Sequence, residues 1–130
     1  MPRALIVALL VAAAIVAESA AAESAPSDSG VRGDIKTGPT CGPVSNPPQP
    51  GCEDRPYQTV IRIRELPDGE PVKKVRSGKR GRFHARLEPG RYRLSPRGGK
   101  SGYPRCFASD VTVTAHEFTV VHLGCDTGIR

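Results

Sequence analysis

Residues 82–94 of this 130-residue chain read RFHARLEPGRYRL, and this stretch decides the fold. Apolar and charged side chains alternate on both sides of Pro89-Gly90. Strict alternation is typical of a half-buried β-strand, because successive side chains point to opposite faces of a sheet. Pro89 presets φ for a tight turn, and Gly90 tolerates the positive φ that such a turn needs. The core-facing side chains in this interpretation are Phe83, Ala85, Leu87, Tyr92 and Leu94.

The same signals continue in both directions from this stretch. Val31 and Ile35 indicate an earlier strand, and Leu66-Pro67-Asp68-Gly69 predicts the turn of a hairpin. Seven short strands are expected in total, around residues 30–35, 60–64, 72–75, 82–87, 91–94, 111–114 and 118–121. Short strands separated by turn signals predict a small antiparallel β-sandwich.

The composition supports an all-β chain with a thin core. The chain holds 14 Gly and 13 Pro, only 5% of its residues are aromatic, and it has no Trp. Pro and Gly both oppose helix interiors, and a domain of this size with few aromatic residues needs additional staples. These numbers argue against a helical bundle, a polytopic membrane protein and a large enzyme with a deep pocket.

The N-terminus has the pattern of a secretory signal peptide. A single Arg3 precedes an apolar run over residues 4–17, and an Ala-x-Ala pair ends at Ala22. As a helix the run extends about 21 Å, shorter than the roughly 30 Å of a bilayer core. We therefore expect residues 1–22 to be cleaved, which makes the protein secreted or periplasmic. The alternative is an uncleaved N-terminal anchor.

Two further segments are expected to lack regular structure. Residues 23–29 have no hydrophobic period and predict a disordered leader. Residues 39–56 contain six prolines, too many for a helix or an internal strand, and predict a long loop. The sandwich domain is therefore expected to span residues 30–130.

The four cysteines predict two disulfides in an exported chain. Three connectivities are possible. We favour Cys41 with Cys52, which pinches the Pro-rich loop, and Cys106 with Cys125. The second pair faces one another if the last two strands form a hairpin in which paired residue numbers sum to 231. A structural zinc site is the alternative, and the absence of paired ligand spacings disfavours it.

The stretch that decides the fold also carries a family resemblance. Gly81-Arg82-Phe83 and Leu87-Glu88-Pro89-Gly90-Arg91-Tyr92 resemble the G-x-F and L-x-P-G-x-Y signature of carboxypeptidase regulatory-like domains. The opening Gly30-Val31-Arg32-Gly33-Asp34-Ile35 is similar to the G-x-V-x-G-x-V start of these domains. The resemblance covers residues 30–125 and implies a transthyretin-like, or prealbumin-like, sandwich with Phe83 and Tyr92 as core anchors on adjacent strands. The fold-motif residues are Gly81, Phe83, Pro89, Gly90 and Tyr92.

The resemblance implies an accessory role, because such modules accompany secreted peptidases, adhesins and carbohydrate-active proteins. The sequence itself contains no H-E-x-x-H or G-x-S-x-G motif, and no Cys/His pattern sets a base beside a nucleophile. We therefore expect no enzymatic activity, no cofactor and no metal. Arg32-Gly33-Asp34 matches an integrin-recognition tripeptide, but it lies in a predicted strand, where coincidence is expected.

Charge is the strongest functional signal in the sequence. The chain has 19 Lys and Arg against 13 Asp and Glu, and Glu88 is the single acid between Lys73 and Arg105. Alternation places arginines on the face opposite the core residues, as one outward stripe. The predicted anion-binding residues are Arg62, Arg64, Arg82, Arg86, Arg91 and Arg93. Guanidinium groups bind sulfate, carboxylate and phosphate bidentately.

These observations predict a secreted, non-catalytic module that binds an anionic or carbohydrate surface. Its partner is expected to be an anionic polysaccharide, a cell-wall polymer or a lipid headgroup surface. One alternative is a structural or protein-interaction domain that docks a partner through an edge strand or the Pro-rich loop. Another is that the charged face is simply solvated. Nucleic acid is disfavoured, because the chain is exported and no aromatic side chains interleave the arginines.

Overall fold

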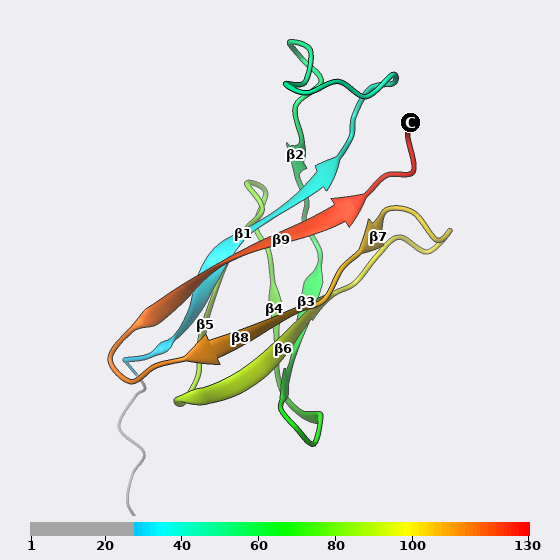
Figure 1. The fold of residues 1–130 in the computed structure, drawn as a ribbon. Helices are drawn as coiled ribbons and strands as arrows, with labels where there is room; N and C mark the ends of the chain where they lie inside the picture. Colours follow the sequence, from blue (N-terminus) through cyan, green and yellow to red (C-terminus); the bar gives the residue numbers. More distant parts are fainter. Residues whose placement is uncertain (1–27) are drawn as a thin grey trace, which may run out of the picture.

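A computed structural model describes residues 28–130, and the predicted signal peptide, residues 1–22, lies outside them. Two β-sheets stack face to face, and residues 28–130 contain no helix (Figure 1). It follows that this part of the chain has no helix able to cross a membrane. The prediction of an all-β sandwich is confirmed.

The first sheet, named sheet A, is built around the longest strands. β1 and β9 pair in parallel along their whole lengths. The short strand β7 pairs with the C-terminal end of β9, on the side opposite β1. β5 pairs antiparallel with the first half of β1, and β2 with the second half. The strand bounds are β1 Gly30–Gly38, β2 Arg55–Pro56, β5 Arg82–Arg86, β7 Arg105–Cys106 and β9 Phe118–Asp126.

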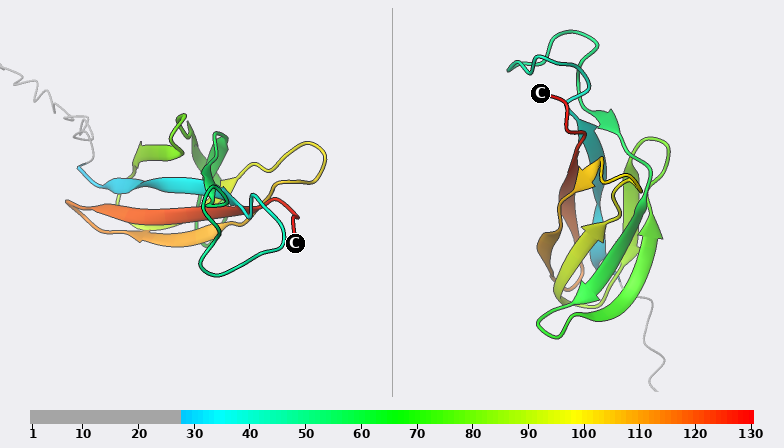
Figure 2. Two further views of the ribbon diagram at one scale, coloured as in Figure 1. Left: turned by 90° about the horizontal axis from the view of Figure 1, so that it is seen from above. Right: turned by 90° about the vertical axis from the view of Figure 1, so that its right-hand side faces the viewer.

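The second sheet, named sheet B, has the order β4-β3-β6-β8 and is antiparallel throughout. A β-bulge interrupts the β3–β4 ladder between Ile63 and Arg64. The strand bounds are β3 Val60–Glu65, β4 Glu70–Arg76, β6 Gly90–Pro96 and β8 Ser109–Val113. Figure 2 shows the two sheets from two further directions.

Four topological expectations are wrong. The described chain has nine strands rather than seven, of which β2 and β7 are two residues long, and β1 and β9 pair in parallel. Phe83 and Tyr92 lie in different sheets rather than on adjacent strands. The last hairpin does not form a ladder, because β8 pairs with β6 while β9 gains a full-length partner in β1.

The pairing predicted for the last hairpin is nevertheless observed at two points. The Thr119 hydroxyl donates to the Thr112 carbonyl oxygen at 2.8 Å, close to the turn. Cys106 lies opposite Cys125, where β7 returns to the edge of β9. In both pairs the two residue numbers sum to 231, as predicted, although β8 itself pairs within sheet B. This explains why the cysteine pairing is right although the predicted ladder is wrong.

Both predicted disulfides are present. Cys41–Cys52 closes the Pro-rich loop, and Cys106–Cys125 joins β7 to β9 with the Cys125 side chain at the edge of the core. The loop and the C-terminus lie at the same end of the sandwich, opposite the start of β1 (Figure 1). Disulfides persist in oxidising compartments, so the protein matures in one.

The core consists of apolar side chains from the inner faces of both sheets. The buried members are Val31, Ile35, Ile61, Ile63, Phe83, Ala85, Leu87, Tyr92, Leu94, Val113, Val121, Leu123 and Cys125. Tyr92 donates its hydroxyl to the Glu88 carbonyl oxygen at 2.6 Å. Burial, followed by the charges of Glu65 and Glu88, raises the pKa of Tyr92. Phe83 and Tyr92 are therefore both core anchors, as expected, but they contribute from opposite sheets.

The ordered sandwich begins before Gly30. Ser29 was expected in the disordered leader, yet only 1% of its surface is exposed. Its hydroxyl donates to the Leu87 carbonyl oxygen at 2.7 Å, and its own carbonyl accepts the Leu87 N–H at 3.0 Å. These two bonds fasten the start of β1 to the end of β5, so Ser29 belongs to the domain.

Gly81 occupies a position where only glycine fits. Its φ is +72°, in the left-handed region, and a Cβ atom would lie 2.4 Å from the Ile35 carbonyl oxygen. The Gly81 carbonyl oxygen accepts the Ile35 N–H at 2.8 Å, which holds the start of β5 against β1. The glycine of the G-x-F motif thus permits a close backbone approach between two strands.

Gly81→Ala is expected to destabilise the fold more than Gly69→Ala. Both glycines have left-handed φ values, +72° and +74°, but a Cβ at Gly69 meets nothing within 4 Å. The left-handed conformation costs an alanine about 1 kcal/mol, and only Gly81→Ala adds a backbone clash. Urea unfolding of both variants measures the difference. Equal losses of stability would contradict the assigned role of the close approach.

Candidate functional site

The six predicted anion-binding arginines do not form one stripe. Arg82 and Arg86 lie on the outer face of sheet A, whereas Arg91 and Arg93 lie on the outer face of sheet B. The reason is that the turn at Pro89-Gly90 carries the chain from β5 in one sheet to β6 in the other. Arg62 and Arg64 on β3 join the sheet B group, as their pairing with β6 requires. The predicted set is therefore split four to two.

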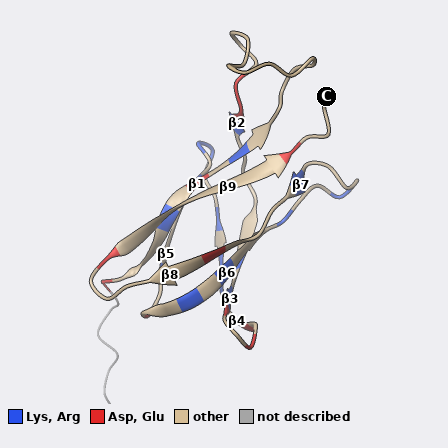
Figure 3. Cartoon of the chain, in the orientation of Figure 1, with Lys and Arg blue, Asp and Glu red and all other residues tan. Residues whose placement is uncertain are grey.

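The outer face of sheet B concentrates positive charge. Ile61, Ile63, Tyr92 and Leu94 point into the core, so the residues between them point outward. In the ladder Arg64 lies opposite Arg93, and Arg62 lies opposite Lys74 of β4. Figure 3 shows lysines and arginines on β3, β4 and β6. We name this set the basic face: Arg62, Arg64, Lys74, Arg91 and Arg93.

One carboxylate, that of Asp110, partly neutralises the charge of the basic face. Asp110 of β8 accepts two hydrogen bonds from the Arg93 guanidinium, at 2.7 and 3.1 Å. The bond from Arg93, followed by the charges of Arg93 and Arg91, lowers the pKa of Asp110. Among residues 28–130, no ion pair joins the other four cations of the basic face to a carboxylate. Like charges placed directly opposite one another destabilise a sheet, so Arg62 and Lys74 repel one another across the β3–β4 ladder.

The bulge opens a groove of about 440 Å³ between β3 and β4, which we name the bulge groove. Its cationic lining residues are Arg62, Arg64, Lys73 and Lys74, and no acidic residue of the described chain lines it. The Lys73 ammonium group donates to the Arg86 carbonyl oxygen at 2.8 Å, so this charge is directed toward β5. The two guanidinium groups and the Lys74 ammonium group are left to hold a carboxylate, sulfate or phosphate group.

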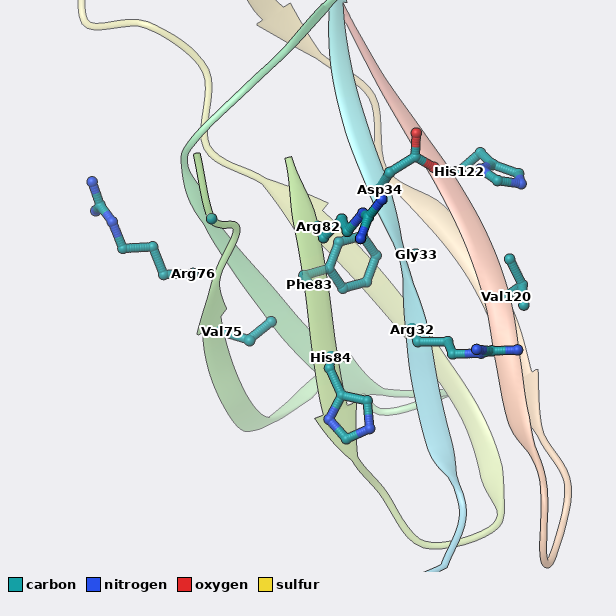
Figure 4. Close-up of a pocket in the computed structure, with 11 residues that line it drawn as sticks. Arg32, Gly33, Asp34, Val75, Arg76, Arg82, Phe83, His84, Val120 and His122 are labelled. Carbon is teal, nitrogen blue, oxygen red and sulfur yellow. Dashed lines mark hydrogen bonds and ion pairs between the residues drawn. The ribbon is translucent and has the colours of Figure 1, made fainter. Parts of the chain in front are cut away.

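A second, larger groove of about 790 Å³ lies on the outer face of sheet A and extends to β4 (Figure 4). It brings together side chains from three strands of sheet A. Asp34 is bonded to Nδ1 of His122, and its carboxylate is 3.9 Å from the Lys36 ammonium group. We name it the sheet A groove, and its polar lining residues are Arg32, Asp34, Arg76, Arg82, His84 and His122. Of the two predicted arginines on this sheet, Arg82 lines the groove and Arg86 lines neither groove.

Sequence reasoning missed Arg32, Asp34 and His122 as one constellation. Alternation identifies Arg32 and Asp34 as outward residues, since Val31 and Ile35 are buried. It does the same for His122, which lies between buried Val121 and Leu123. The missing information is the parallel pairing of β1 with β9, which sets Asp34 beside His122.

Comparison with known proteins adds no assignment. No protein-family model matches the chain, and no curated protein matches it. Within the described residues, no group of three or more His, Cys, Asp or Glu side chains is arranged to hold a metal ion. The resemblance to carboxypeptidase regulatory-like domains remains a prediction, and the geometry of the two outer faces carries the functional argument.

Arg93→Gln is expected to raise the pKa of Asp110. The guanidinium of Arg93 supplies the largest contribution to the lowered value, and Arg91 keeps a smaller one. The side-chain carboxyl resonance of Asp110, followed by NMR from pH 2 to 6, reports the midpoint. Arg62→Gln is the matched control, because it removes the same charge from the same face without touching Asp110. A midpoint unchanged by Arg93→Gln would contradict the pairing.

Proposed function

We propose that this protein is a secreted, non-catalytic β-sandwich module that binds an anionic polymer or surface through the basic face of sheet B. The observation that carries the proposal is the bulge groove, which Arg62, Arg64 and Lys74 line and no described carboxylate lines. Export through the predicted signal peptide fits the two disulfides. The proposal includes the transthyretin-like, carboxypeptidase regulatory-like assignment of the sandwich.

The spacing of the cations supports a repetitive partner. Neighbouring strands lie about 4.8 Å apart, and outward residues on one strand recur about every 7 Å. The cross-strand pairs Arg62 with Lys74 and Arg64 with Arg93 therefore form a grid of charges across three strands. Repeated sulfate, carboxylate or phosphate groups on an anionic polysaccharide, a cell-wall polymer or a lipid surface contact several points of such a grid at once. Single weak contacts then add up through multivalency.

A protein-interaction role is the second candidate, and two exposed features favour it. β7 covers β9 only at Cys125 and Asp126, so the earlier part of β9 has no strand on that side in residues 28–130. Val120 of this uncovered segment is 52% exposed. The Pro-rich loop also projects beyond the sheets, with Val44 58% exposed at its surface (Figure 1). Docking on either feature depends on backbone pairing or apolar contact rather than on charge.

Binding to dextran sulfate at pH 7.5 tests the proposal. We expect the triple variant Arg62→Gln, Arg64→Gln, Arg91→Gln to bind roughly tenfold more weakly, since three exposed charge contacts are removed. The variant leaves the Arg93–Asp110 pair intact. The matched control is Arg32→Gln, Arg82→Gln, Arg86→Gln, which removes the same net charge from sheet A. It is expected to bind almost as the wild type does.

Salt dependence separates the two candidate functions. Binding through the basic face is expected to weaken steeply between 50 and 200 mM salt, because mobile ions screen exposed charges. Equal losses in both triple variants would mean that only net charge matters and would contradict a specific face. Unchanged binding in the basic-face variant would exclude that face, and salt-insensitive capture would favour the protein-interaction role.

A further inference from the structure

One side of β9 has no partner strand over most of its length. β7 pairs with this side only at Cys125 and Asp126, and Figure 1 shows β7 beside the C-terminal end of β9. From Phe118 to Leu123, no strand within residues 28–130 pairs with it. Such an edge presents a row of backbone N–H and C=O groups that accept another strand. We name residues 118–123 the open edge.

Two backbone hydrogen bonds identify the residues that face outward along the open edge. The Glu117 carbonyl oxygen accepts an N–H from β1 at 3.1 Å, and the Gly124 carbonyl oxygen accepts an N–H from the residue after β7 at 3.1 Å. Successive residues of a strand direct their backbone groups to opposite sides, so odd-numbered residues of β9 face β1 and even-numbered residues face away from it. The residues that offer N–H and C=O groups to the open edge are Phe118, Val120 and His122.

The other sheet edges of the described chain carry charge or proline, and the open edge carries neither. β2 and β4 contain Pro56 and Pro71, β4 adds two lysines, β5 contains two arginines, and β8 contains Asp110. Residues 118–124 read FTVVHLG, without Lys, Arg, Asp, Glu or Pro. Natural sheets use charged side chains and proline to keep their edges from pairing. Among the described strands, β9 is therefore the one whose edge lacks this protection.

Exposed apolar side chains lie along the open edge. Val120 is 52% exposed and Phe107 is 54% exposed. The Phe107 N–H is the donor to Gly124, which sets this residue beside the C-terminal end of the open edge. Covering both side chains removes apolar surface from water and favours association.

We propose that two copies of this chain pair antiparallel through the open edge, about a two-fold axis at Val120. This register sets Val120 opposite Val120 of the second copy, and Phe118 opposite His122 of the second copy. Residues opposed in this way exchange two backbone hydrogen bonds in each pair. With the axis at Val121, Phe118 would instead meet Gly124 of the second copy, whose carbonyl is already bonded. The axis at Val120 therefore gives the longer ladder.

Charge complementarity favours a second copy as the partner. Glu117 immediately precedes β9, and within residues 28–130 it joins no ion pair. At the other end of β9, Arg105 lies opposite Asp126, and Arg130 adds a second positive charge. An antiparallel two-fold arrangement brings the start of one β9 toward the end of the other, so the acidic residue approaches the basic end. Inside the ladder no like charges oppose one another, because the open edge has none.

This inference goes beyond anion binding and gives the protein-interaction role a specific partner. Sedimentation velocity of the oxidised protein over a range of concentrations, without polymer, tests it. We expect a reversible equilibrium between monomer and dimer. The dimer is expected to persist at high salt, because backbone bonds and apolar contacts form the ladder, and salt screens the repulsion between two chains of formal net charge +6.

Val120→Lys is expected to weaken dimerisation roughly tenfold or more, since it sets two ammonium groups opposite one another at the axis. The matched control is Val44→Lys, which makes the same change at a valine of the Pro-rich loop that is 58% exposed. It is expected to dimerise as the wild type does. A second measurement needs no variant: amide hydrogen exchange of Val120 and His122 in the wild type is expected to slow as the protein concentration rises.

Several results would overturn the inference. They are a monomer at every concentration, a dimer that Val120→Lys does not weaken, equal losses in both lysine variants, or a dimer in which the exchange of the Val120 amide is not slowed. Dextran sulfate binding is measured at protein concentrations where the chain is monomeric. Failure of either proposal is therefore seen without the other.

Discussion

The space between the two sheets accepts no charge, and this constraint determines where every functional group of the protein lies. The buried polar residues of the described chain are Ser29, Thr59 and Ser77, all neutral. The Ser77 hydroxyl donates to the Tyr57 carbonyl oxygen and accepts the Thr59 N–H, both at 2.8 Å. Burying an unpaired charge costs far more than burying a bonded hydroxyl. The arginines and lysines of the strands consequently lie on the outer faces, at the ends or, for Lys73, at the open edge between β4 and β5.

The path of the chain then distributes these charges between the two faces. The turn at Pro89-Gly90 transfers the chain from β5 to β6, so consecutive outward arginines arrive on opposite sides of the molecule. One side receives a flat field of cations with a groove at the bulge. The other receives arginines among two histidines, an aspartate and the half-exposed Val120. Two outer faces of different chemistry thus result from one continuous basic stretch of sequence.

Local features were predictable from the sequence because they depend on near neighbours. Alternation identifies Phe83 and Tyr92 as core residues, and the proline content identifies the long loop. Both disulfides were predictable, since Cys41 and Cys52 lie within that one loop and the Cys106–Cys125 register holds where β7 meets β9. Each of these inferences requires only the period of a strand or the reach of a short loop.

The sheet to which each strand belongs was not predictable from alternation. Alternation with a period of two residues identifies the side chains that face the core. The alternation is identical for a strand in either sheet, so it does not identify the sheet. Arg62, Arg64, Arg91 and Arg93 were therefore identified as outward residues and correctly grouped, while Arg82 and Arg86 were wrongly added to them. The bulge beside Arg64 and the approach of His122 to Asp34 depend on pairings between distant segments, and no local pattern records them.

The central claim is that an anionic polymer binds the outer face of sheet B and not that of sheet A, and an NMR map of backbone amides tests it most directly. Dextran sulfate at pH 7.5 is predicted to shift amides of β3, β4 and β6 and to leave those of β1, β5 and β9 unchanged. A single set of shifts that spans both sheets would contradict the claim.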